Sequence, residues 1–319
     1  GPRDTNPFLH IPAGFMKTLV NPKVNWLYET EPSEGTAGRR IQQPRGKTLG
    51  GSSSINGHIY NRGQRLDYDV WAQMGNRGWS YAQVLPYFKR CERREGDGDD
   101  TFRGRDGRYV IEDLEWEHPL CDAFVEGAAS VGIPINPDYN GASQEGVGFF
   151  QRSINKGLRV SSARAYLHPV MERQNLDVRI NAHAVAILFE GKRAVGVRFR
   201  QGGEYKEVRA AREVILCGGS FNSPQLLQLS GIGPGPVLHD LGIPIHHELA
   251  GVGENLRDHY PIRMTARARS TWTINERARG LPLAWEVMKY LVARKGILTL
   301  QPTLVACFWK SDESLEYGD

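Results

Sequence analysis

Two glycine-rich segments of the sequence could bring bare main chain against a ligand. In residues 46–57, GKTLGGSSSING, Gly50 and Gly51 stand directly before three consecutive serines. Glycine has no Cβ, so it allows close approach to the peptide backbone, and serine hydroxyls cap helix N-termini or donate hydrogen bonds. The second segment, residues 219–233, follows an apolar run and a further glycine. A strand, a glycine turn and a helix start, in that order, are where α/β sheets bind ligands.

The elements that would position these segments are read from residue periodicity. Four apolar residues in a row at 214–217 indicate a strand buried on both faces, as in a parallel sheet. Asn222-Ser223-Pro224 then supplies an N-cap and a proline suited to a first helical turn, and Gly231 is placed to end the helix. Short runs of period two over 176–211 predict an antiparallel meander. Helical spacing predicts a helix pair over 67–94 with a break at 75–80, and single helices over 119–131 and 161–174.

Composition excludes several classes of protein. The 319 residues are 40% hydrophobic and 24% charged, as in globular proteins, and no apolar run reaches the roughly 20 residues of a membrane span. The formal charge of +4 is scattered, so no nucleic-acid surface is expected. The four cysteines form no C-x-x-C pair, so neither a disulfide scaffold nor a zinc site is predicted, and reduced thiols favour a cytoplasmic location. No G-x-S-x-G frame of a serine hydrolase occurs.

Taken together, the two glycine-rich segments resemble the two signature segments of the glucose-methanol-choline (GMC) family of flavin-dependent oxidoreductases. The stretches 67–92, 157–185 and 251–259 carry the same resemblance, which covers nearly the whole chain up to His259. It implies an α/β fold: an FAD/NAD(P)-binding-type domain with a parallel sheet and a β-meander, and an α+β substrate domain with an antiparallel sheet, both incomplete.

The resemblance also implies a set of residues that hold FAD. A valine of the family pairs its backbone with the adenine, and the glycine–serine loop contacts the flavin or its diphosphate. Some relatives attach the flavin through a histidine before the asparagine of this loop; Ile55 stands there, so non-covalent FAD is expected. The matching positions are Gly50, Gly51, Ser52, Asn56, Gly57, His58, Ile59 and Val185.

Two parts of the family pattern are not found in the sequence. The G-x-G-x-x-G fingerprint has no match, and the family's catalytic histidine belongs to a region C-terminal to Asp319. We therefore expect an internal fragment with no catalytic residue of its own, no metal site, and little or no flavin bound by residues 1–319 alone. His259 is expected to have a structural hydrogen-bonding role.

The predicted reaction is oxidation of a primary alcohol to an aldehyde, with hydride transfer to flavin N5. Choline-oxidising relatives have a glutamate two residues after Asp-His, where it can pair with a trimethylammonium group; Pro261 occupies that position here and favours an uncharged alcohol. The alternatives are a choline dehydrogenase-like activity, a hydroxynitrile lyase-type member of the family, and a catalytically inactive fragment.

The remaining expectations concern domains and partners. Residues 1–62 and 169–258 are assigned to the FAD-binding domain, and 63–168 and 259–319 to the cap or substrate domain. The expected partners are a small alcohol and an electron acceptor, either oxygen or a quinone, with a homo-oligomer possible and no nucleic acid or transmembrane segment.

Overall fold

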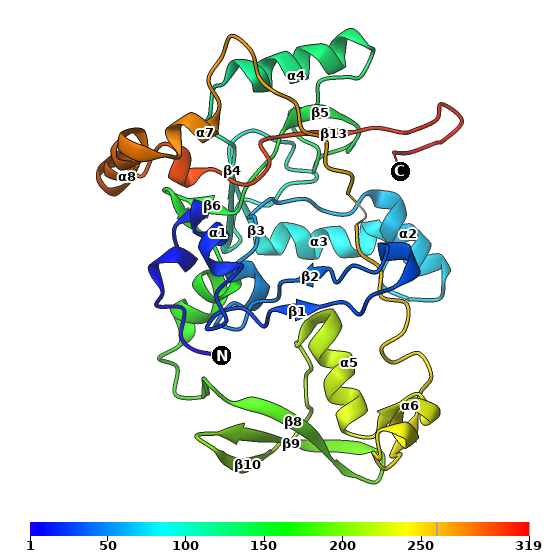
Figure 1. Ribbon diagram of the computed structural model, residues 1–319. Helices are drawn as coiled ribbons and strands as arrows, with labels where there is room; N and C mark the ends of the chain where they lie inside the picture. Colours follow the sequence, from blue (N-terminus) through cyan, green and yellow to red (C-terminus); the bar gives the residue numbers. More distant parts are fainter. Residues whose placement is uncertain (260, 319) are drawn as a thin grey trace. The chain divides into compact units, whose positions relative to one another are not determined.

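The chain forms two compact units in the computed structural model, which describes residues 1–259 and 261–318 (Figure 1). Unit 1 comprises Gly1 and Arg179–Arg267, and unit 2 comprises Pro2–Val178 and Ala268–Asp319. Each mixes helices with small sheets, which confirms the predicted mixed α/β class in its coarse form. Within the described ranges, no helix has the length and apolar character needed to cross a membrane. The division into FAD-binding and substrate domains stays a prediction.

Unit 1 is built on the predicted antiparallel meander. Strands β8 (His183–Glu190), β9 (Arg193–Gln201) and β10 (Glu204–Arg209) lie in the order β10-β9-β8 (Figure 1). Alternating residues bury Ile187, Val195 and Phe199, as the period of two requires. Helix α5 (Gly219–Leu229) contacts β8, and the Ile187 N–H donates to Ser230 Oγ just beyond the helix at 2.8 Å. Helix α6 (Gly235–Asp240) and the parallel pair β11 (Ile232–Gly233) and β12 (His247–Glu248) complete the unit.

Three local predictions in and next to unit 1 are wrong. The run 214–217 is not a strand, and Ile215 is 73% exposed. A strand covered on both faces needs neighbouring strands, and no strand of the described residues pairs with this run. Helix α5 begins at Gly219 rather than at Asn222-Ser223-Pro224, which lie inside it. The Ser223 hydroxyl accepts from the Gly218 N–H at 3.0 Å. Residues 176–180 are likewise not a strand.

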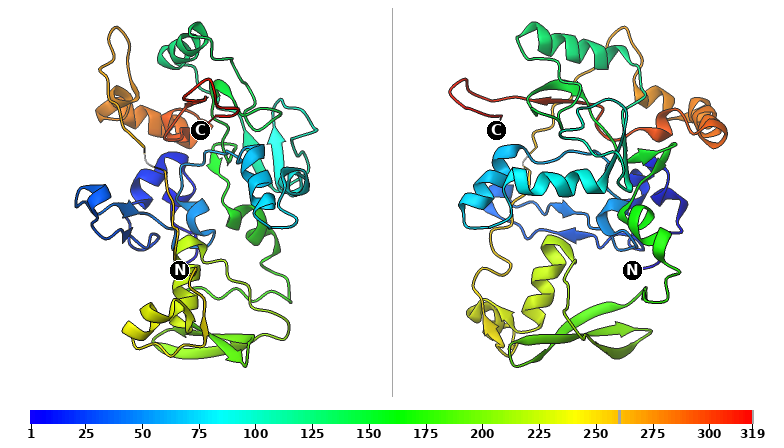
Figure 2. Two further views of the ribbon diagram at one scale, coloured as in Figure 1. Left: turned by 90° about the vertical axis from the view of Figure 1, so that its right-hand side faces the viewer. Right: turned by 180° about the vertical axis from the view of Figure 1, so that it is seen from behind.

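Three of the predicted helices of unit 2 are confirmed. Helices α2 (Arg65–Gln73) and α3 (Tyr81–Cys91) form the expected pair, with the break between them, and α4 (Pro119–Ser130) covers the third prediction. Figure 2 shows the ribbons of α2 and α3 side by side. Ser80 and Gln83 form a capping box at the start of α3, and Tyr68 of α2 packs its ring against Tyr81 and Phe88 of α3. Apolar spacing therefore predicts both that these helices form and which of their faces pack together.

The helix predicted over 161–174 forms only in part. A π-helical turn, Ala163–Leu167, passes into a 3₁₀ turn, His168–Val170, and the chain then leaves the helical path. Pro169 lacks the N–H that would continue an α-helical ladder, which explains the early end.

Small sheets and short helices complete unit 2. Strand β5 (Gly146–Phe149) pairs antiparallel with β13 (Val305–Phe308), so distant parts of the sequence meet (Figure 1). Its core includes two small apolar clusters, one of Leu9, Val24 and Ile55 and one of Val110, Val160 and Ala165. The other elements are α1 (Phe15–Thr18), α7 (Ile274–Arg277), α8 (Gly280–Ala293), the antiparallel pair β1 (Tyr28–Glu29) and β2 (Gln42–Gln43), the parallel pair β3 (Glu92–Glu95) and β4 (Tyr109–Glu112), and the antiparallel pair β6 (Ile154–Asn155) and β7 (Leu158–Arg159).

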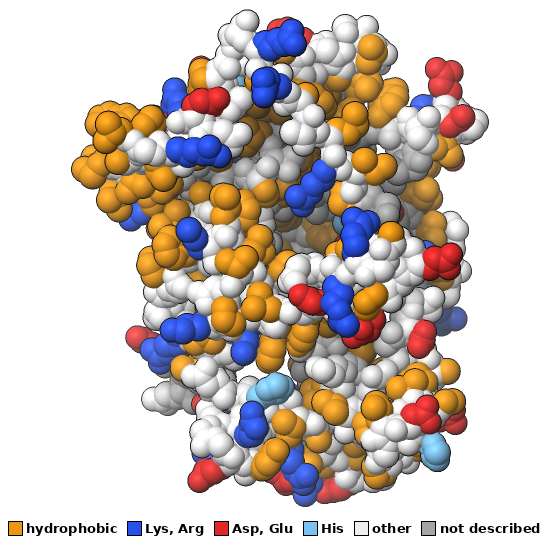
Figure 3. Space-filling view, in the orientation of Figure 1, with side chains coloured by type: hydrophobic (Ala, Val, Ile, Leu, Met, Phe, Trp, Pro, Cys, Tyr) orange, Lys and Arg blue, Asp and Glu red, His pale blue; other side chains and the backbone are white. Residues whose placement is uncertain are grey.

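Helix α8 turns polar residues inward and apolar residues outward. Tyr290 donates from its hydroxyl to Gly157 O at 3.0 Å, and Glu286 Oε2 accepts from the Ile297 N–H at 3.1 Å; both side chains are buried. Apolar side chains gather on the outer surface of this helix (Figure 3), where Leu281, Trp285, Met288, Leu291 and Val292 are exposed. Hydrogen bonds thus contribute much of what attaches α8 to its unit.

A buried network of charges ties the loop after β3 to the rest of unit 2. Glu92, with no exposed surface, accepts from Arg62 Nη2 and, at 2.8 Å, from Arg103 Nε. Arg103 also pairs with Asp138, and Gln151 donates to the same Asp138 carboxylate. Removing one member of such a network leaves a buried charge without its partner, which costs far more than losing a surface pair.

We expect the substitution Glu92→Ala to lower the free energy of unfolding of unit 2 by about 3–5 kcal/mol, because two buried guanidinium groups lose their shared carboxylate. All seven tryptophans of the chain lie in unit 2, so urea unfolding followed by tryptophan fluorescence reports on it. The control Glu31→Ala removes an exposed partner of Arg40 and should change stability by no more than about 1 kcal/mol. Equal effects of the two substitutions would contradict the role given to Glu92.

Candidate cofactor site

The glycine–serine loop folds into a tight turn held by its own hydroxyl groups. Gly50 and Gly51 both have positive φ, +84° and +54°, and lead into the 3₁₀ turn η4 (Gly51–Ser54). Ser53 Oγ donates to Gly50 O at 2.6 Å and Ser54 Oγ donates to Leu49 O at 2.8 Å. Ser52 Oγ accepts from the Gly46 N–H at 3.1 Å. The serines therefore use their hydroxyls to fix the loop.

The two adjacent glycines have different surroundings. A Cβ on Gly50 would collide with Ser54 Oγ and press on Ala163, so this glycine is required by packing inside the unit. A Cβ on Gly51 would meet no atom within 4 Å. On the side where a Cβ would stand, Gly51 therefore faces open space in the described part of the chain, which leaves room for a flat cofactor.

The segment after β7 supports the loop from behind. The Ser162 N–H donates to Ser53 Oγ at 2.9 Å, and Ser162 Oγ donates to Gly50 O at 3.2 Å. Arg159 Nη1 donates to Ser53 O at 3.2 Å and to Asn56 Oδ1 at 2.8 Å. Residues 159–163 and 50–56, distant in sequence, form one hydrogen-bonded body within unit 2.

Asn56 is exposed in this body, as is Ser52. Its Oδ1 accepts from Arg159 Nη1 and also, at 3.1 Å, from the His58 N–H. Both neighbours are donors, so the oxygen must face them and the Nδ2 amide group must point the other way. Asn56 thus offers hydrogen-bond donors at the surface of the loop.

His58 lies in the interior instead of on the surface. Its side chain has no exposed area, its φ is +49°, and its ring packs edge-on against Phe15. Burial, with the nearby charges of Arg159 and Arg152, lowers the pKa of His58 to about 2. The ring is neutral at physiological pH and cannot reach a ligand at the surface of the loop.

The remaining predicted residues take three different positions. Gly57 packs against Pro302, where a Cβ would collide with the proline ring. Ile59 pairs with Arg152 in an isolated antiparallel bridge. Val185 belongs to unit 1, at a register shift of β8, the edge strand of the meander. A bulged residue at a sheet edge leaves backbone groups outside the ladder, which suits a backbone contact to a ligand.

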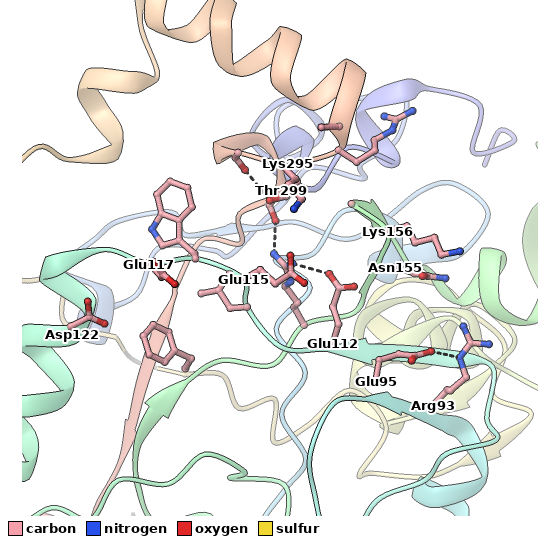
Figure 4. A pocket seen from close by; sticks show the side chains of 18 residues that line it. Arg93, Glu95, Glu112, Glu115, Glu117, Asp122, Asn155, Lys156, Lys295 and Thr299 are labelled. Carbon is pink, nitrogen blue, oxygen red and sulfur yellow. Dashed lines mark hydrogen bonds and ion pairs between the residues drawn. The ribbon is translucent and has the colours of Figure 1, made fainter.

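A second feature, a cavity of about 1350 Å³ in unit 2, is lined by charges of both signs. Glu112 pairs with Arg152 at 2.8 Å. Arg93 faces Glu95 at 3.0 Å (Figure 4). Burial raises the pKa of Glu112 although Arg152 opposes this shift. Among the described residues that line the cavity there is no histidine, no cysteine and none of the predicted cofactor residues.

Sequence reasoning missed Arg159. It stands in the stretch GLRVSSAR, where an arginine two residues before a serine pair has no feature that marks it as buried. Arginine is exposed in most proteins, so only the fold reveals a buried one. His259, by contrast, lies exposed, and its N–H donates to Asp258 Oδ1 at 2.9 Å.

Comparisons with known proteins agree on one family. The family model described as GMC oxidoreductase matches residues 11–261. The chain is 41% identical to an alcohol dehydrogenase (acceptor) of Pseudomonas putida over 302 residues, 94% of this chain and 55% of that protein. It is 46% identical to an oxygen-dependent choline dehydrogenase of Sinorhizobium fredii over 259 residues, 81% of this chain and 47% of that protein. It spans about half the length of these curated relatives.

Solved structures show the same likeness. An FAD-dependent oxidoreductase from Chaetomium thermophilum aligns with 97% of this chain and 56% of its own, with a TM-score of 0.85 and 27% identity. Pyridoxine 4-oxidase from Mesorbium loti aligns with 77% of this chain and 48% of its own, with a TM-score of 0.73 and 33% identity.

The buried His58 should make stability depend on pH. The folded state keeps the ring neutral down to about pH 2, whereas the unfolded state binds a proton below about pH 6.5. The free energy of unfolding should therefore fall as the pH falls through this window, by up to about 1.4 kcal/mol per pH unit. We expect His58→Gln to show a shallower loss between pH 6 and pH 4 in urea titrations. The exposed His239→Gln is the control and should keep the original slope; identical slopes for both variants would rule out a neutral buried His58.

Proposed function

Because the chain belongs to the GMC oxidoreductase family, we propose that the complete protein is an FAD-dependent oxidoreductase that converts a primary alcohol to an aldehyde. The observation that carries the proposal is the loop at Gly50 and Gly51. It combines two left-handed residues, open space beside Gly51, and an exposed amide donor at Asn56. FAD, when bound, would accept the hydride that leaves the alcohol carbon.

The chain's own residues fit this cofactor. Gly51 removes the side chain that would hold a ring away from the main chain, and Asn56 aims its Nδ2 group outward. Val185, on the edge strand of the meander, is proposed to pair its backbone with the adenine. A further part of the proposal is that residues 1–62 and 169–258 serve FAD binding, and 63–168 and 259–319 serve substrate binding.

FAD is proposed to bind without a covalent bond. The position that carries a linking histidine in some relatives is Ile55, 2% exposed and packed with Leu9 and Val24. The nearby His58 has its ring buried, so it offers no accessible nucleophile at the loop surface.

The base that takes the alcohol proton is proposed to lie outside residues 1–319, in the region C-terminal to Asp319. A general base must come within hydrogen-bond reach of the hydroxyl, and such a group typically contributes about 10²–10⁴-fold in rate. Neither the buried His58 nor the exposed His259 is proposed as this base. Oxygen and a quinone are both retained as electron acceptors.

The substrate is proposed to be an uncharged primary alcohol, because Pro261 stands where choline-oxidising relatives have a glutamate. Choline is the second candidate, since choline dehydrogenases are 39–46% identical to this chain. Proline offers no carboxylate for a trimethylammonium group, which decides our order of preference.

We expect the complete FAD-loaded protein, mixed anaerobically with a panel of aliphatic and aromatic primary alcohols, to lose its flavin absorbance near 450 nm, whereas choline should bleach it far more slowly. The restored carboxylate in Pro261→Glu should raise the relative rate with choline. Faster bleaching by choline than by every neutral alcohol would refute the substrate assignment. Cyanide release from a cyanohydrin without bleaching would identify a lyase.

Acid precipitation of the complete protein should leave the yellow cofactor in the supernatant, because Ile55 cannot form a bond to the flavin. Absorbance of the supernatant and of the redissolved pellet measures the two fractions. A pellet that retains the flavin would contradict non-covalent binding. A complete protein that binds no FAD at all would refute the proposed function itself.

A further inference from the structure

Arg159 carries a buried positive charge without a carboxylate partner. The side chain is 1% exposed, and within residues 1–259 and 261–318 no acidic group lies within ion-pair distance of it. Its Nη1 donates to Ser53 O and Asn56 Oδ1, while Nε and Nη2 have no hydrogen-bond partner in the described part of the chain. An uncompensated buried guanidinium is costly, so its presence behind the loop calls for an explanation.

The other buried arginines in the described part of unit 2 each pair with a carboxylate. Arg62 and Arg103 share Glu92, Arg94 pairs with Asp113, and Arg152 pairs with Glu112. Arg159 is equally buried but has no such carboxylate partner among the described residues.

The charge on Arg159 persists at neutral pH. Burial lowers the pKa of Arg159 only to about 10, so the guanidinium stays protonated. The titratable groups that interact with it are Tyr109 and His58, and burial raises the pKa of the first and lowers the pKa of the second. Both are therefore uncharged at pH 7, and no group in residues 1–259 and 261–318 forms an ion pair with Arg159 to neutralise it.

This charge acts on one exposed group, the Asn56 amide. Arg159 Nη1 and the His58 N–H occupy Oδ1, which fixes the amide plane and leaves Nδ2 as the outward group. A cation bonded to the oxygen also draws electron density from the amide, which makes Nδ2–H a stronger donor. A strong donor held in one orientation suits an acceptor that gains negative charge.

We propose that Arg159 is a positioning residue for the flavin: it fixes the Asn56 amide as a donor and strengthens it, so that the reduced ring is stabilised. This inference rests on the proposed function, because the acceptor in question is the FAD ring, whose N1 and C2 carbonyl region gathers negative charge on reduction. The role needs no contact between Arg159 and the cofactor.

The test is the flavin midpoint potential of the complete FAD-loaded protein, measured by equilibration with reference dyes. In Arg159→Met we expect the equilibrium constant for two-electron reduction to fall at least tenfold, a decrease of about 30 mV. Arg159→Lys keeps the charge with a single donor group and should recover part of this loss. Arg40→Met removes one exposed positive charge and is the control that should leave the potential unchanged.

A double-mutant cycle separates positioning from a general effect. If Arg159 acts through Asn56, adding Arg159→Met to Asn56→Ala should change the equilibrium constant by less than about threefold. An unchanged potential in Arg159→Met, or full tenfold effects that multiply in the double variant, would overturn the inference.

Asn56→Asp tests the inference even if Arg159→Met does not fold. The aspartate keeps the shape of asparagine and gives Arg159 a counter-ion, so the melting temperature should equal or exceed that of the wild type. The outward donor is lost, so the potential should still fall by about 30 mV or more. If Asn56→Asp lowers the melting temperature and leaves the midpoint potential unchanged, the role proposed for Arg159 and Asn56 is refuted. If the wild-type protein binds FAD and all these variants keep its midpoint potential, this inference is refuted, whereas the proposed function is not.

Discussion

The left-handed turn at Gly50 and Gly51 is the constraint on which the candidate site depends. Two successive residues with positive φ are unfavourable for any residue with a Cβ, and glycine loses more conformational freedom than other residues when it is ordered. The fold offsets this cost with hydrogen bonds from Ser53, Ser54 and Ser162 to the carbonyls of the turn. Among the described residues, no atom lies within 4 Å of the position that a Cβ of Gly51 would take, so the turn is open on this side.

Unit 2 holds this turn with polar groups as much as with apolar ones. Its apolar clusters are small, while Arg62, Arg94, Arg103, Arg152 and Arg159 are all buried. Arginines outside the regular elements pair with glutamates on the short strands β3 and β4. Arg152, for example, bonds Glu112 and the Thr299 carbonyl, and its backbone bridges Ile59 next to the loop. The site therefore sits on a scaffold whose order depends on complete pairing of charges, and the unpaired Arg159 stands out against it.

Elements whose hydrogen bonds are made locally were predicted correctly from the sequence, whereas a strand that needs distant partners was not. The apolar spacing predicted α2, α3 and α4 correctly, because a helix makes its contacts between residues three and four apart in the same segment. The strand expected at 214–217 did not form because a strand takes its hydrogen bonds from other segments. The meander β8–β10 formed because its partners are adjacent in sequence and joined by two-residue turns.

The sequence by itself determined the family, the local helices, the meander and the glycine–serine loop, since all of these are written in residues that are close in the chain. Only the tertiary structure decided which of the loop residues face outward. It placed His58 inside and Asn56 outside, although the two are separated by one residue and both are polar. It also brought Arg159 to Asn56 across a hundred intervening residues. Burial and long-range hydrogen bonding depend on how distant segments pack, and no local pattern of residue types records that.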